Sequence, residues 1–222
     1  DCEGVDWAAV TCPLHQDPEY RAAEDQVLLR KNYHAVGSFE REHRPQALDQ
    51  LGFASQLVFN TFASSALEAA EHGDDLDLAY AMADAHNRAM LHFCEVDPRL
   101  LAVGYVALAD VDRAADQARR AIDDGVAALM IASSCPRTHS PSHIGLDRVW
   151  AQAQEARVPI LMHVGGGGTL LSPRYFDNGL PPVPDFHGGA ENFRSVDYMA
   201  IPYPPMQTMA TLILDGVLDR FP

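Results

Sequence analysis

The sequence lacks several signals that would assign it to a common class of protein. Its 222 residues contain no apolar run near the roughly 18 residues of a membrane-spanning helix, and the longest, Val126 to Ala132, has the length of a buried strand. No charged region followed by an apolar region opens the chain, so no secretory signal peptide is visible. The four cysteines form no C-x-x-C pair, and we expect free thiols in a cytoplasmic protein rather than zinc ligands or disulfides.

Basic residues are also scarce. Sixteen lysines and arginines face thirty-one acidic residues, which gives a formal charge of −15. A surface of this charge repels phosphate backbones and anionic lipids. We therefore expect neither nucleic acid nor a membrane among the partners, although the acidity does not identify the substrate.

Common catalytic motifs are missing as well. The sequence has no G-x-G-x-x-G after its first predicted strand, no P-loop, no H-E-x-x-H and no G-x-S-x-G. Asp1 is not an initiator methionine, and the chain stops at Phe221-Pro222 directly after a helical pattern. We therefore expect an internal piece of a longer protein, and expect this piece to be inactive alone.

The composition that is present, 47% hydrophobic and 21% charged, is typical of a globular protein, and we predict a single incomplete domain over residues 1–222. Residues 1–44 form an irregular lead-in, with a helix from Asp17-Pro18 to about Asn32. Strands and helices then alternate. Strands are predicted at 56–59, 101–108, 127–131 and 159–163. Helices are predicted from Pro45 to Leu51, over 74–96, over two stretches centred on Ala115 and Val149, and from Met206 through Val217. The apolar stripe of the last helix consists of Met206, Met209, Ala210, Ile213 and Val217.

Apolar strands between amphipathic helices indicate a parallel sheet covered by helices, either a barrel or an open doubly wound sheet. In both folds the chemistry lies at the carboxyl ends of the strands. That rule selects Asn60, Leu108 to Asp110, Ser133 to Cys135 and, above all, His163.

His163 ends the fourth predicted strand and precedes Val164 and four glycines, Gly165 to Gly168. A histidine there is either a metal ligand or catalytic residue, or a hydrogen-bonded residue of the rim. The glycines alternatively suggest a phosphate cradle, although no Lys-Ser or Lys-Thr follows. His139 and His143 have ligand spacing, but Pro141 between them indicates a loop. His86 lies on an apolar helical stripe, and we interpret it as a core histidine.

Residues 164–205 form a Gly- and Pro-rich stretch, long for a connection within a domain. Its six aromatic residues argue against disorder, so we interpret it as a lid over the site; the alternative is an insertion that packs on the surface or on another subunit. His187, Glu191 and Arg194 are its candidates for substrate contact, beside Asn60 in the sheet.

Four segments together resemble the amidohydrolase-related superfamily of metal-dependent hydrolases and decarboxylases. Val158 to Gly168 is similar to its fifth-strand motif, and Ala47 to Thr61 to its second strand and the preceding helix. Asn87 to Gly104 resembles the helix that leads to the third strand, and Gly216 to Pro222 the stretch before the sixth. The resemblance covers roughly residues 45 to 222.

This resemblance implies a partial (β/α)₈ barrel, with about strands two to five present and a lid-like insertion after the fifth. It also implies one divalent metal ion, zinc or manganese, and it transfers only one of the family's ligands to this chain, His163. The other ligands and the acid/base residue lie outside the chain or are missing from a degenerate homologue.

The reaction that the resemblance implies is hydrolysis of a small organic, possibly aromatic, substrate by metal-activated water. The alternative within the family is non-oxidative decarboxylation. A non-catalytic barrel that binds a ligand without metal is the alternative of another class, and a flavin- or NAD-linked barrel is a third option. A homo-oligomer is a further expectation.

Overall fold

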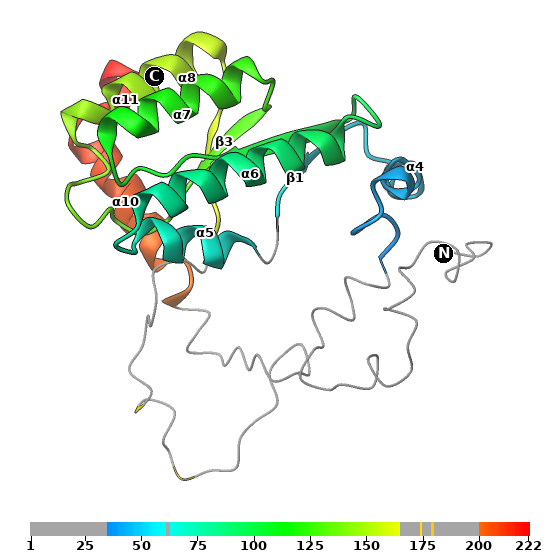
Figure 1. Cartoon of the computed structure of the whole chain (residues 1–222), viewed down its shortest axis with the longest axis horizontal. Coiled ribbons are helices and arrows are strands. Elements are labelled where there is room, and N and C mark those ends of the chain that lie inside the picture. Colours follow the sequence, from blue (N-terminus) through cyan, green and yellow to red (C-terminus); the bar gives the residue numbers. More distant parts are fainter. Residues whose placement is uncertain (1–34, 61–62, 165–173, 175–178, 180–199) are drawn as a thin grey trace. The chain divides into compact units, whose positions relative to one another are not determined.

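The computed structural model describes residues 35–60, 63–164, 174, 179 and 200–222. Its helices and strands are shown in Figure 1. In chain order they are η3 (Arg41–His43), α4 (Arg44–Leu51), β1 (Gln56–Val58), α5 (Ala63–Glu71), α6 (Leu76–Cys94), β2 (Leu100–Tyr105), α7 (Val111–Asp123), β3 (Ala128–Ile131), η4 (Ile144–Leu146), α8 (Asp147–Ala156), β4 (Ile160–Met162), α10 (Tyr203–Leu214) and α11 (Val217–Arg220). The helix predicted after Asp17-Pro18 lies outside the described residues, as does most of the 164–205 segment.

Contacts divide the chain into two units. Of the described residues, the first unit contains 35–56, 96–100, 174 and 179, and the second contains the rest. The prediction of a single domain over residues 1–222 stays a prediction.

In the first unit, α4 ends at Gly52, whose left-handed φ of 71° closes the helix. The guanidinium of Arg99 joins two segments of this unit. It holds the carboxylate of Asp97 at 2.7 Å and that of Asp49 in α4 at 2.6 Å. The backbone oxygen of Arg99 also accepts from the N–H of Gln56 at 2.9 Å, where β1 begins.

The second unit is built on a four-stranded sheet with the order β1-β2-β3-β4. Strands β2, β3 and β4 are parallel, with Val103 opposite Ala128 and Leu129 opposite Ile160. The sheet curls as half of a barrel, so the predicted partial (β/α)₈ barrel is confirmed. The four strands are those predicted from sequence, although β2 ends at Tyr105 rather than Leu108.

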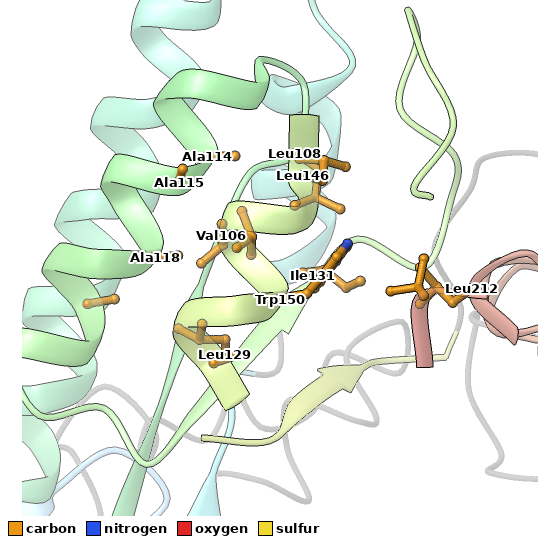
Figure 2. Packing of buried hydrophobic residues seen from close by; sticks show 14 of the residues in the cluster. Val106, Leu108, Ala114, Ala115, Ala118, Leu129, Ile131, Leu146, Trp150 and Leu212 are labelled. Carbon is orange, nitrogen blue, oxygen red and sulfur yellow. The ribbon is translucent and has the colours of Figure 1, made fainter. Parts of the chain in front are cut away.

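Side chains alternate between two faces of this sheet. On the helix face, strand residues pack with α7, α8 and α10, as Figure 2 shows. The buried residues of this cluster include Val106, Leu129, Ile131, Ala115, Ala118, Trp150 and Leu212. The other face, called the inner face here, carries Val103, Tyr105, Ala128 and Met130, packed with residues of α5 and α6.

Two helices of the second unit begin at an aspartate that caps their N-terminus. Asp75 caps α6 by accepting from the N–H of Leu78 at 3.0 Å, and Asp110 caps α7 by accepting from the N–H groups of Asp112 and Arg113. Helices α7 and α8 pack against each other (Figure 1).

Three features differ from the sequence prediction. Helix α5 was not predicted, because its Ala- and Ser-rich sequence has no clear apolar period. The single helix expected from Met206 through Val217 is two helices, separated at Gly216, whose φ of 69° cannot continue a right-handed helix. The buried residues of α10 are Pro204, Thr208 and Leu212, while the predicted stripe residue Met206 is 63% exposed.

Candidate metal and substrate site

His163 lies directly after β4, at the carboxyl end of the strand. Its Nδ1 is 2.7 Å from the backbone oxygen of Val164. Because a carbonyl oxygen only accepts, Nδ1 carries a proton, and in the neutral ring Nε2 then presents a lone pair. Metal-binding histidines show the same arrangement, one nitrogen on the metal and the other N–H donating to a backbone carbonyl or carboxylate. The side chain therefore fits a divalent metal at Nε2.

Phe59 faces His163 from the other end of the sheet. The two ring centroids are 6.2 Å apart and the ring planes meet at 63°. Neighbouring strands lie about 4.8 Å apart, so a flat sheet would separate β1 from β4 by roughly 14 Å. The contact therefore requires the curl of the sheet, and it brings the carboxyl ends of β1 and β4 to one place.

A single predicted ligand is present in this part of the chain. Among residues 35–60, 63–164 and 200–222, no group of three or more His, Cys, Asp or Glu side chains could hold a metal ion. His139 and His143 lie in a loop, as predicted from Pro141 between them, and the centroids of their rings are 5.2 Å apart. His187, Glu191 and Arg194 lie outside the described residues.

Asn60 follows Phe59, but its carboxamide turns toward α6. Its Nδ2 donates to Nε2 of His86 at 2.5 Å, and its Oδ1 accepts from the hydroxyl of Ser64 at 2.7 Å. His86 then donates from Nδ1 to Oδ1 of Asn87 at 3.0 Å. Burial lowers the pKa of His86, which agrees with a neutral ring that accepts at Nε2 and donates at Nδ1. The substrate contact predicted for Asn60 stays a prediction.

On the side of β2 opposite β3, side chains hydrogen-bond the backbone at the carboxyl end of the strand. Asn87 accepts from the N–H of Tyr105 at 2.6 Å and donates to its C=O at 2.9 Å. Two residues later, the N–H of Ala107 donates to Gln117 at 3.0 Å and its C=O accepts from the hydroxyl of Tyr80 at 3.0 Å. In a parallel strand both backbone groups of a residue point to one side. These side chains therefore replace a ladder.

Glu71, at the end of α5, is buried beside the same strand end. Its Oε2 is 2.5 Å from the hydroxyl of Tyr105, and its Oε1 accepts from the N–H of Leu108 at 2.7 Å. Burial raises the pKa of Glu71, and the two hydrogen bonds act in the opposite direction. Sequence reasoning missed this carboxyl, because nothing near it in the chain marks it as buried.

The segment after β3, Ser133 to Cys135, lines a pocket of about 300 Å³ with residues of α10. Thr208 of α10 donates to the backbone oxygen of Ser133 at 2.8 Å, which ties this helix to the strand end. In the same segment, the backbone oxygen of Cys135 lies 3.0 Å from Nε2 of His72. Cys135 is a free cysteine, as predicted, and Cys2 and Cys12 lie outside the described residues.

The family is settled by a match over most of the chain. The family model described as amidohydrolase matches residues 32–222. The chain therefore belongs to the amidohydrolase family, in agreement with the resemblance drawn from its motifs. A comparison with curated proteins gave no match.

Solved structures share the fold. An amidohydrolase from Mycobacterium avium subsp. paratuberculosis is 24% identical, with a TM-score of 0.67 over 84% of this chain and 46% of its own. A 5-carboxyvanillate decarboxylase from Novosphingobium aromaticivorans, complexed with manganese and 4-hydroxy-3-methoxy-5-nitrobenzoic acid, is 19% identical, with a TM-score of 0.61 over 94% of this chain and 52% of its own. A 2,6-dihydroxybenzoate decarboxylase from Rhizobium is 16% identical, with a TM-score of 0.60 over 89% of this chain and 60% of its own. The chain thus spans about half the length of these proteins.

No helix within the described part of the chain is both long and apolar enough to cross a membrane.

Proposed function

We propose that the protein carrying this chain is a metal-dependent hydrolase of a small organic substrate, with His163 as one ligand of a single divalent metal ion, zinc or manganese. The observation that supports this most directly is the hydrogen bond from Nδ1 of His163 to Val164, which fixes the ring with Nε2 available. Family membership supports the metal, and manganese is present in the 5-carboxyvanillate decarboxylase structure.

A divalent metal at this position supplies Lewis acidity and lowers the pKa of bound water toward ~7. The residues of this chain orient the metal ligand and shape the site around it. The backbone oxygen of Val164 orients the imidazole of His163. Phe59 gives the opposite side of the site an apolar surface, which excludes water from one face of a bound substrate. Glu71, Tyr80, Asn87 and Gln117 keep the carboxyl end of β2 in place.

Non-oxidative decarboxylation is the second candidate. Two of the solved structures with this fold are decarboxylases of aromatic acids. A decarboxylase would hold the carboxylate of its substrate at the metal ion for which His163 is a ligand. Release of CO₂ from aromatic carboxylic acids, compared with hydrolysis of esters and amides by the same preparation, separates the two reactions.

The remaining expectations accompany this proposal. A cytoplasmic location accompanies the proposal, and the free thiol of Cys135 agrees with a reducing compartment. The homo-oligomer, and the expected lack of nucleic-acid and membrane partners, stay predictions. A barrel that binds a ligand without metal remains the competing function.

Metal content tests the proposal. We expect about one divalent metal ion per chain in the full-length protein by elemental mass spectrometry, and a large loss of metal in His163→Ala. His92→Ala, which removes an exposed histidine of α6, is the matched control and should keep its metal. A wild-type protein that stays metal-free after incubation with zinc and with manganese would contradict the proposal and favour a binding protein.

A further inference from the structure

Both ring nitrogens of His72, the residue directly after α5, face backbone oxygens. Nδ1 lies 2.8 Å from the oxygen of Glu68, one turn earlier in α5, and Nε2 lies 3.0 Å from the oxygen of Cys135. A carbonyl oxygen only accepts, so the two hydrogen bonds form together only when both nitrogens carry a proton. The charged imidazolium therefore joins the end of α5 to the segment after β3.

A third group offers the neutral ring a different partner. The hydroxyl of Ser134 lies 3.3 Å from Nε2 of His72. A hydroxyl can donate to a neutral Nε2, whereas the carbonyl oxygen of Cys135 can only place a lone pair against it. If Nδ1 keeps its proton for Glu68, the neutral ring accepts from Ser134 and loses its hydrogen bond to Cys135. One proton thus decides which of two adjacent residues the ring binds.

Acidic groups lie on the α5 side of His72. Glu68 and Glu71 belong to α5, and Asp74 follows it. Burial raises the pKa of Glu71, whose carboxyl is bonded to the hydroxyl of Tyr105, and a positive charge on His72 acts on that pKa in the opposite direction. The charged ring therefore has groups of opposite charge near it at this end of the helix.

The segment after β3 contributes a second cation. Arg137 donates to the backbone oxygen of His72 at 2.9 Å and pairs with Asp74 at 2.8 Å. A guanidinium does not lose its proton in a protein, so Arg137 holds the segment at the end of α5 whether or not His72 is charged. The thiol of Cys135 turns to the backbone oxygen of His139, with Sγ at 3.6 Å.

The segment is thus fixed on both sides of Cys135. On one side, Thr208 of α10 holds the backbone oxygen of Ser133, and on the other side Arg137 holds the end of α5. Between these points, residues Ser133 to Cys135 line the pocket of about 300 Å³. A proton on the imidazole therefore acts on the wall of this pocket and leaves its two anchors in place.

We propose that His72 is a proton-operated latch, whose imidazolium holds the backbone oxygen of Cys135 at the end of α5. Loss of the Nε2 proton to solvent releases Cys135, and Nε2 then accepts from the hydroxyl of Ser134. Histidine changes its charge between about pH 5 and about pH 8, so the latch opens as the pH rises through this range. The latch needs no metal ion, and its operation does not depend on the function proposed for His163.

The test is a pH titration of the full-length protein by NMR, with ¹⁵N in the histidine rings and ¹³C in the cysteine carbonyls. The signals are assigned by their absence from His72→Gln and Cys135→Ser. We expect Nε2 of His72 to lose its proton between about pH 5 and about pH 8, and the carbonyl signal of Cys135 to shift with the same midpoint. A carbonyl signal that does not follow the ring of His72 would overturn the latch.

His72→Gln separates the latch from other titrations. A carboxamide can donate to Cys135 at any pH, so this variant should lose the step in the carbonyl signal. The titration of the Cys135 thiol itself remains in the variant and serves as an internal reference. His92→Gln makes the same change at an exposed histidine of α6 and should keep the step. A step of unchanged size in His72→Gln would also overturn the latch.

Crystal structures of the wild-type protein at about pH 5 and about pH 8 give a measurement that needs no variant. At the higher pH, the distance from Nε2 of His72 to the oxygen of Cys135 should exceed hydrogen-bonding distance, and that to the hydroxyl of Ser134 should shorten. The same two distances at both pH values would contradict the latch. None of these outcomes depends on metal content, so the latch and the metal site can fail separately.

Discussion

The carboxamide of Asn87 pairs with both backbone groups of Tyr105, accepting at 2.6 Å and donating at 2.9 Å. One side chain of α6 thus takes the place of a strand on the side of β2 opposite β3. Buried backbone groups left without a partner cost free energy, so the pairing sets how well the carboxyl end of the strand is held.

The first prediction concerns this pairing. Asn87→Leu is close in size but leaves the N–H and C=O of Tyr105 unpaired, and it should reduce the free energy of unfolding of the full-length protein by about 2–4 kcal/mol. Urea denaturation measures the change. Arg88→Leu, at the next and exposed position of α6, is the control and should change stability by less than about 0.5 kcal/mol. Equal effects of the two substitutions would show that the pairing contributes nothing.

The second prediction concerns the buried carboxyl of Glu71. Burial raises its pKa, so the folded protein binds a proton here more tightly than the unfolded chain does. This contribution to stability is complete below the unfolded pKa, about 4.3, and is lost as pH rises through the folded pKa. Glu71→Gln can still accept from Leu108 and donate to Tyr105, and it carries no charge. Its stability relative to wild type should therefore increase with pH.

Unfolding measured at several values between about pH 4.5 and about pH 8 tests this dependence. A constant difference between Glu71→Gln and wild type would contradict it. Glu71→Ala removes both hydrogen bonds and should cost about 2–4 kcal/mol at the acid end of this range, and less as pH rises, because alanine also lacks the buried charge. Glu68→Gln, one turn earlier in α5 and less buried, is the matched control for the loss of a carboxylate.

The third prediction concerns His86, whose pKa is lowered by burial. Here the unfolded chain binds the proton more tightly, so stability is complete above the unfolded pKa, about 6.5, and is lost as pH falls toward the folded pKa. Protonation would also place an N–H against the Nδ2 of Asn60, where the neutral ring accepts. His86→Gln should lack this acid-dependent loss, and His92→Gln, on the exposed side of α6, should keep it. Parallel pH dependences of wild type and His86→Gln would rule out this origin.

The fourth prediction compares two glycines with the same backbone conformation. Gly37 and Gly52 have φ values of 68° and 71°, which any other residue adopts at a cost. A Cβ at Gly52 meets nothing within 4 Å, whereas one at Gly37 would lie 2.5 Å from the backbone of Arg44. Gly52→Ala should therefore cost about 1 kcal/mol, and Gly37→Ala clearly more. Thermal unfolding of both variants measures the difference, and equal costs would mean that the segment around Arg44 moves aside.

Sequence reasoning found what local patterns encode. The apolar periods of α6, α7 and α8 and the short apolar strands identified the alternation of the barrel, and the residues around His163 carried the family resemblance. It missed interactions between distant parts of the chain. Glu71, Asn87 and Gln117 are polar residues on helices, and only their contacts with β2 and the segment after it explain why they are buried. Phe59 was not distinguished from a core residue, because its relation to His163 exists only once the sheet has curled.

The hydrogen-bond acceptor that orients His163 is the peptide oxygen of Val164. An orienting aspartate or glutamate can be lost in a single mutation, but no side-chain substitution removes a peptide oxygen. The tautomer and direction of this imidazole are therefore robust to mutation at residue 164 as long as the local backbone is kept. Evolution could then remodel the walls of the pocket for new substrates while this histidine stayed correctly oriented.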